Sequence, residues 1–111
     1  MIDTDLLGSL TRVLDLCAMR HDVLASNLAN IDTPGYHTRD LDFRRALQQA
    51  EPSAAAPTHK VRGLTARPDG NNVSLERETL LLAQNQLLFS ASVQVMKSEF
   101  RQLSSAINEG K

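Results

Sequence analysis

Three histidines and one cysteine are the residues of this 111-residue chain that could ligate a metal or attack a substrate. His21, His37 and His59 are far apart and form no H-x-x-x-H spacing, so we predict no metal site. The single cysteine, Cys17, excludes an internal disulfide framework and a multi-cysteine metal cluster. Its place in an apolar repeat is typical of a small buried hydrophobic residue, and no basic partner is placed to activate it.

Paired carboxylates are the other candidate for chemistry. Asp40 and Asp42 flank Leu41 and could be mistaken for an acid–base pair, but R-D-L-D-F is explained more simply by polar residues around two buried apolar ones. Residues 69–71 (D-G-N) begin like a calcium loop, yet the later ligands of a twelve-residue loop are missing, so we interpret them as a turn. No Walker loop, Rossmann glycine pattern or nucleophile elbow is present. The sequence therefore predicts no enzymatic activity and no cofactor.

The charge and composition of the chain limit the classes of partner that it could bind. Twelve Lys and Arg residues against thirteen Asp and Glu give a net charge of −1, which indicates neither a nucleic-acid partner nor an anionic membrane surface. No apolar run is long enough to span a bilayer, and residues 1–5 lack the features of a cleaved secretory signal. We expect a soluble protein made in the cytoplasm, with no direct membrane insertion and no small-molecule substrate.

Two heptad patterns predict long helices, and these must position the other elements of the chain. The first predicts a helix over 6–31 with a seam at Leu7, Leu10, Leu14, Cys17, His21, Leu24, Leu28 and Ile31. The second predicts a helix over 74–108 with a seam at Leu75, Thr79, Leu82, Gln86, Phe89, Val93, Met96, Phe100, Leu103 and Ile107. Ser74 is expected to be its N-cap, and Gly110 to end it at C′. The predicted fold is mainly α, a single elongated domain (1–111) whose terminal helices pair as a coiled-coil hairpin.

The middle of the second helix has no charged residue between Glu78 and Lys97. Several apolar residues there lie outside the seam: Leu80, Leu81, Leu87, Leu88 and Val95. One interpretation is a broad stripe in a small bundle. We favour burial against neighbouring subunits, because each exposed leucine would forfeit roughly 1.5–3 kcal/mol of burial.

Shorter elements are expected in the turn motif and irregular middle segment, residues 32–73. Pro34 and Gly35 fit the second and third positions of a turn, where glycine tolerates a positive φ. The remaining predictions are a short helix at 43–50 capped by Asp42, a loose linker at 51–57, a short strand or hairpin within 58–67, and a turn at 68–72.

Residues 24–36 read L-A-S-N-L-A-N-I-D-T-P-G-Y, which resembles the N-terminal signature of the axial proteins of the bacterial flagellum, the rod and hook subunits. Two later segments, D-G-N-N-V-S-L-E-R-E and A-Q-N-Q-L-L-F, and the continuation H-T-R-D-L-D-F are similar to the proximal rod proteins. The matching positions are Asn27, Asn30, Thr33, Pro34, Gly35 and Tyr36 in the shared signature, Arg39, Asp40, Leu41 and Phe43 in the continuation, and Asp69, Gly70, Asn71 and Asn72 before the second helix. Cys17 departs from the pattern, since exported axial proteins usually lack cysteine, and the segment 44–68 is short for the family.

The resemblance implies a structural subunit of the proximal rod of the basal body, polymerising with itself and other rod proteins into the shaft needed for motility. It also implies contact with the basal-body ring and the flagellar type III export apparatus, export without a cleaved signal peptide, and a place in the rod that spans the periplasm. The competing hypothesis is a cytosolic helical adaptor or export chaperone that forms a discrete dimer. We further expect the isolated chain to be poorly ordered at its ends.

Overall fold

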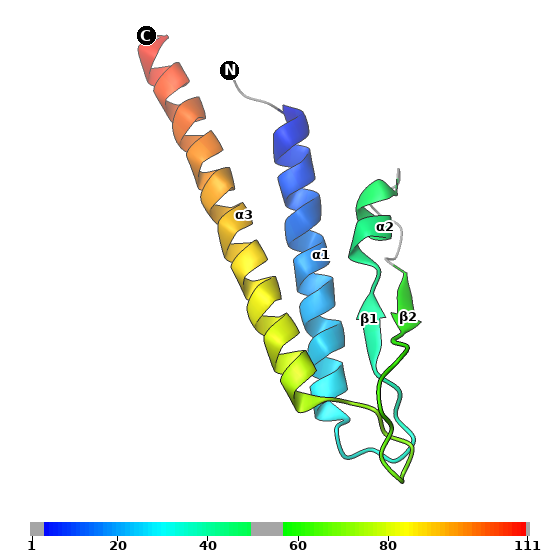
Figure 1. Ribbon diagram of the computed structural model, residues 1–111. Helices are drawn as coiled ribbons and strands as arrows, with labels where there is room; N and C mark the ends of the chain where they lie inside the picture. The colour runs from blue at the N-terminus through cyan, green and yellow to red at the C-terminus, as the bar shows by residue number, and fades with distance from the viewer. Residues whose placement is uncertain (1–3, 50–56, 111) are drawn as a thin grey trace.

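Two long antiparallel helices and a small hairpin beside them make up the computed structural model, which describes residues 4–49 and 57–110 (Figure 1). Helix α1 spans Thr4–Ala29 and α3 spans Leu75–Glu109. Between them lie strand β1 (Arg39–Leu41), helix α2 (Phe43–Gln48) and strand β2 (Thr58–Lys60). The molecule measures 69 × 26 × 18 Å. The predicted mainly α fold with paired terminal helices is confirmed, while most of the predicted linker at 51–57 lies outside the described residues.

Local chemistry sets the helix ends. Helix α1 stops at Ala29, two residues before the predicted end: the Asn30 side chain donates to the Ser26 carbonyl at 2.8 Å, and the next N–H, that of Ile31, bonds only three residues back to Leu28 at 3.2 Å. Helix α3 begins as predicted, with Ser74 Oγ accepting from the Arg77 backbone N–H. The expectation for Gly110 is wrong in detail: it is the C-cap itself, at φ −75°, and needs no left-handed conformation.

The face that α1 turns to its neighbours matches the predicted seam only in part. Cys17 and Leu24 are buried as expected. His21, also predicted in the seam, is exposed, because it lies at the flank of the helix pair, where a hollow opens between α1 and α3. Leu16 was not predicted and is fully buried, because the hairpin covers a second side of the helix.

On α3 the predicted seam is confirmed only in part, because Leu82, Val93, Met96 and Leu103 are half-buried while the buried residues lie beside it. The buried residues are polar and seven apart, Glu78, Asn85 and Ser92, so one face of the helix still meets α1 at a heptad repeat. Predicted seam residues that are instead exposed are Leu75, Thr79, Gln86, Phe89, Phe100 and Ile107. A hydrophobic pattern misses this line of contact because Glu78 and Asn85 make hydrogen bonds to α1, while the hydroxyl of Ser92 donates to the Leu88 carbonyl of its own helix.

The apolar residues outside the contact line remain uncovered by the described chain. Leu80 is 58% exposed, Leu87 72%, Leu88 41% and Val95 43%. A broad stripe buried within a small bundle would have placed these side chains under another element, and no described element lies over them. Figure 1 also shows α3 running beyond the start of α1, so its last turns have no partner helix within the described chain.

The hairpin packs on the side of α1 opposite α3. Strands β1 and β2 are antiparallel, with Arg39 opposite Lys60 and Leu41 opposite Thr58. Asp42 caps α2 as predicted, accepting from the Arg45 backbone N–H at 3.1 Å. A small core forms where Leu16, Leu41 and Ala46 meet, with Phe43 packed against it. No helix in the described ranges is long and apolar enough to cross a membrane.

Candidate functional site

The chain turns twice at one end of the helix pair, in a first loop (residues 30–38) after α1 and a second loop (residues 67–73) before α3. In the first loop the Tyr36 N–H donates to the Thr33 carbonyl at 3.2 Å. Pro34 and Gly35 are the central residues of this turn, and Gly35 has φ +74°. This is the predicted turn, of the type that requires a positive φ at its third residue.

The two loops touch at a pair of glycines. The Gly35 N–H donates to the Asp69 carbonyl at 2.8 Å. Gly70 lies so close that a Cβ on it would be 3.4 Å from the Gly35 Cα, and its own φ is +87°. The Gly70 N–H in turn donates to the Arg67 carbonyl at 2.8 Å, which closes the predicted turn at 68–72. Two segments more than thirty residues apart in sequence thus meet through backbone that has no side chains to separate it.

Asn71 ties the second loop to the end of α1. Its side chain is fully buried, and its Nδ2 donates to the carbonyls of Asn30 (2.9 Å) and Thr33 (2.8 Å). Its Oδ1 accepts from the Val73 N–H at 2.8 Å. The amide is therefore satisfied on both its donor and acceptor sides, so Asn71 holds the first loop against the start of α3.

Asn72 makes a second link beside it. Its backbone N–H donates to the Tyr36 carbonyl at 3.3 Å, and its Oδ1 accepts from the Thr38 N–H at 2.7 Å. The guanidinium of Arg67 also donates to the Ile31 carbonyl. Together these bonds fix the path of the first loop into β1.

Asn27 joins four of the segments at this end. Its Oδ1 accepts from the Tyr36 hydroxyl and the Arg39 N–H, both at 3.1 Å. Its Nδ2 donates to the Arg39 carbonyl at 2.7 Å and to Glu78 Oε2 at 2.9 Å. With 0% exposure, Asn27 uses the full bonding capacity of a side-chain amide to join α1, the first loop, β1 and α3.

A chain of ion pairs continues from Glu78. Its Oε1 lies 2.6 Å from Arg77 Nη1, and Arg77 Nη2 lies 3.3 Å from Asp40 Oδ2. Arg20 of α1 binds Asp40 through two nitrogens, at 3.0 and 2.9 Å. Asp40 is buried rather than placed on the surface around apolar residues, because two guanidinium groups neutralise it. We call Asn27, Glu78, Arg77, Asp40 and Arg20 the polar clasp.

The polar clasp has no features of a catalytic centre. Its two carboxylates each face a cation, and its donors are engaged within the chain, so no acid, base or nucleophile is left open to a substrate. Arg20, Arg77 and Glu78 were not among the site residues predicted from the sequence. The last two were contained in the matching segment D-G-N-N-V-S-L-E-R-E, whereas Arg20 gives no local signal because its partner is on another element.

The residues that match the resemblance fall into two groups in the structure. Most are joined by hydrogen bonds or backbone contact at the loop end of the molecule: Asn27, Asn30, Thr33, Gly35, Tyr36, Arg39, Asp40, Asp69, Gly70, Asn71 and Asn72. Pro34 is exposed, and Leu41 and Phe43 belong instead to the small core against α1.

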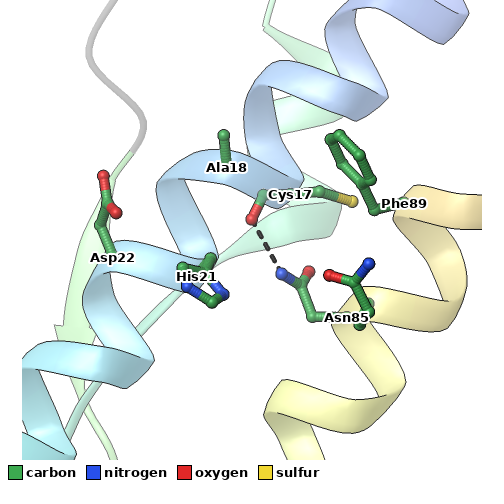
Figure 2. Close-up of a pocket in the computed structure, with 7 residues that line it drawn as sticks. Cys17, Ala18, His21, Asp22, Asn85 and Phe89 are labelled. Atoms are coloured by element: carbon green, nitrogen blue, oxygen red, sulfur yellow. Dashed lines mark hydrogen bonds between the residues drawn. The ribbon is translucent and has the colours of Figure 1, made fainter.

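Cys17 lies in a separate hollow of about 270 Å³ between α1 and α3 (Figure 2). Figure 2 shows its sulfur directed toward Phe89, while Asn85 Nδ2 donates to the Cys17 carbonyl at 2.8 Å. Burial raises the pKa of the Cys17 thiol, and the charge of Arg20 opposes this in part. The thiol therefore stays protonated at neutral pH, which does not suit a nucleophile. Within 4–49 and 57–110, no three His, Cys, Asp or Glu residues are grouped to hold a metal.

Known proteins are similar in sequence to this chain, both in its loop-end segment and over most of its length. A family described as "Flagella basal body rod protein" matches residues 18–37, from the middle of α1 into the first loop. The chain is 30% identical to the flagellar basal body rod protein FlgB of Salmonella typhimurium, over 87% of this chain and 88% of that one. It is 29% identical to FlgB of Escherichia coli, with the same shares covered, and 29% identical to FlgB of Bacillus subtilis, over 93% of each chain.

Proposed function

This chain belongs to the FlgB family of flagellar basal body rod proteins, and from that premise we propose that it is a structural subunit of the proximal rod. In this role it assembles with other rod components in the basal body and is not an enzyme. The similarity to FlgB along nearly the whole of both chains carries the proposal.

The exposed apolar side chains of α3 support the proposal from the structure. Leu80, Leu87 and Val95 lie on a stretch of helix without charge and would each be stabilised by burial in an assembly. The adaptor alternative has no such support, because a discrete dimer needs one self-complementary patch. The apolar residues of α3 occur instead on more than one face.

The loop end of the molecule suits a contact that depends on shape. Buried Asn27 accepts a hydrogen bond from Tyr36 of the first loop, and buried Asn71 of the second loop donates to the Asn30 and Thr33 carbonyls, so the outer surfaces of both loops are presented in one conformation. We propose that the matching residues of both loops serve assembly through this fixed geometry. Substitution of Pro34 or Gly35 is then expected to impair assembly without loss of any chemistry.

Finer partners follow from the same role. The rod begins at the membrane-embedded ring, so we propose that this chain contacts the basal-body ring and passes through the flagellar export apparatus without a cleaved signal peptide. A chain that reserves its apolar surface for neighbours is also expected to be poorly ordered at its ends when isolated. Hydrogen exchange on a verified monomer checks this, and strong protection through the whole of both helices would contradict it.

Gene deletion with complementation tests the main proposal. We expect a deletion strain to lack assembled rods and motility, and a wild-type copy to restore both. The complemented strain should contain the chain in purified basal bodies. A fully motile deletion strain would refute the proposal, and so would a chain found only in the cytosol as a closed oligomer.

A further inference from the structure

Two oppositely charged surfaces lie on different elements of the molecule, and neither is used within it. The first, which we call the hairpin patch, consists of His37, His59, Lys60 and Arg62 around a hollow of about 740 Å³. All four side chains are exposed. No hydrogen bond or ion pair engages them within the described part of the chain.

Unlike the side chains of the hairpin patch, the other arginines nearby are bound by partners within the molecule. Arg20 and Arg77 are held by Asp40, and Arg39 donates to Thr58 Oγ1 at 3.2 Å. The only acidic residue paired with the patch across the two strands is that same Asp40, opposite His59, and it is already neutralised. The patch therefore keeps its positive charge for something outside the molecule.

The second surface is the outward face of α1. Asp15 and Asp22 are exposed and two helical turns apart, about 10.5 Å along the axis, on the same side of the helix. Both arginines of α1 point elsewhere: Arg12 donates to the Ala46 carbonyl and Arg20 to Asp40. We call Asp15 and Asp22 the α1 acidic face, because neither is paired with the two arginines of its own helix.

Arg39 of β1 lines the same hollow as Asp22. Its guanidinium is bound to Thr58 and makes no ion pair with Asp22. Both charged surfaces are thus available at once on every copy of the chain.

We propose that the hairpin patch of one copy binds the α1 acidic face of the next copy. The inference rests on the proposed function and identifies one of its subunit contacts. Because the two surfaces differ, a contact between them that is repeated in one direction is head-to-tail and leaves one free surface at each end. Such a contact extends into an open array, whereas reciprocal pairing of the same surfaces would close two copies into a dimer. Opposite charges also favour the correct mutual orientation during encounter.

Charge reversal on each surface tests the contact in cells that carry only the variant chain. Replacing Lys60→Glu with Arg62→Glu, or Asp15→Lys with Asp22→Lys, sets like charges against each other. We expect each pair to lower the amount of chain in purified basal bodies by about tenfold or more. All four substitutions together restore opposite charges between copies and should recover most of the incorporation. Arg44→Glu with Arg45→Glu, on the exposed face of α2, is the matched control and should have little effect.

The outcomes separate this contact from the proposed function. Normal incorporation of either reversed pair, or failure of the fourfold variant to recover, overturns the contact between copies. A loss confined to the hairpin reversal points to an acidic surface on another rod component and overturns it also. An equal loss in the α2 control shows that net charge, not this surface, is responsible. In each case a non-motile deletion strain still supports a rod subunit.

A mixing experiment with purified chains gives a second readout. The hairpin-reversed and α1-reversed variants should each fail to associate alone in low salt, and should associate when mixed, because each then offers what the other needs. Analytical ultracentrifugation measures this, with circular dichroism to check that the variants are folded. Association of the mixture should weaken at 500 mM salt, where the screening length falls to about 4 Å. A mixture that stays monomeric in low salt overturns the contact.

Discussion

The substitution Asn27→Asp separates the electrostatics of the polar clasp from its packing. It changes one NH2 group to an oxygen and leaves the shape of the side chain nearly the same. The aspartate keeps the acceptor for Tyr36 and Arg39. On its other side, an oxygen now replaces the nitrogen that lies 2.9 Å from Glu78 Oε2. Two carboxyl groups then share a site that is 0% exposed at both residues.

The expected loss of stability depends on whether both carboxyl groups stay charged or share one proton. Two unit charges 2.9 Å apart repel by about 6 kcal/mol at an effective dielectric constant near 20. Holding one proton between the carboxyls costs about 1.4 kcal/mol for each pH unit above the unfolded carboxyl pKa of about 4. The proton is therefore taken up at low pH, and the loss of stability is about 1.5 kcal/mol at pH 5. It rises with pH to at most about 5 kcal/mol at pH 8, because Arg77 Nη1, 2.6 Å from Glu78 Oε1, offsets part of the repulsion.

The stability of the variant falls as the pH rises, because its folded state binds one proton more than its unfolded chain in this range. Urea unfolding followed by circular dichroism at pH 5, 6.5 and 8 measures the difference from wild type. Combining Asn27→Asp with Glu78→Gln removes the second charge and should abolish the extra pH dependence. A loss of less than about 1 kcal/mol at pH 8, or an equal loss at pH 5 and pH 8, would refute the reasoning.

Three further results are expected from purified chains. Gly35→Ala should cost about 1–2 kcal/mol in urea unfolding because Gly35 has φ +74°, whereas Gly8→Ala in open space on α1 should stabilise by about 0.5–1 kcal/mol; equal effects would contradict the turn geometry. Cys17 should react with a thiol reagent on the order of 100-fold more slowly in the folded chain than in urea, and since burial raises its pKa, wild type should lose stability relative to Cys17→Ala above about pH 8.5; rapid labelling of folded chain would show that the thiol is not buried. Leu24→Ala should cost about 2–5 kcal/mol, and Leu87→Ala, at 72% exposure, less than about 0.5 kcal/mol while lowering incorporation into basal bodies; a large stability loss from the second would mean that Leu87 is covered within the monomer.

Features fixed by neighbouring residues could be predicted from the sequence. Ser74 and Asp42 cap their helices through the backbone N–H three residues on. Gly35 takes a positive φ because Pro34 before it sets the turn type. The two long helices also followed from their apolar periodicity, since a pattern over many residues outweighs local exceptions.

Features that depend on distant partners could not be predicted. The sequence pattern gave no reason to bury Glu78, because its partners come from α1 and from the residue before it. Asn85 likewise faces α1, where its amide donates to the Cys17 backbone carbonyl of another element. A hydrophobic pattern ranks such residues as surface, and the predicted alignment of α3 was therefore correct only in part. The resemblance located the loop residues, but only the structure joined the first loop to the second.

The bond from Asn85 to the Cys17 carbonyl has a consequence for sliding of one long helix along the other. A seam of leucines alone would pack almost equally well after a shift of one heptad, about 10.5 Å along the axis. Here such a shift would remove Asn85 from the Cys17 carbonyl and Glu78 from Asn27, leaving a buried carboxylate without its amide donor. The polar residues of α3 that face α1 therefore permit only one alignment of the two helices. Every copy then has the same length and the same overhang of α3, which a shaft of uniform spacing requires.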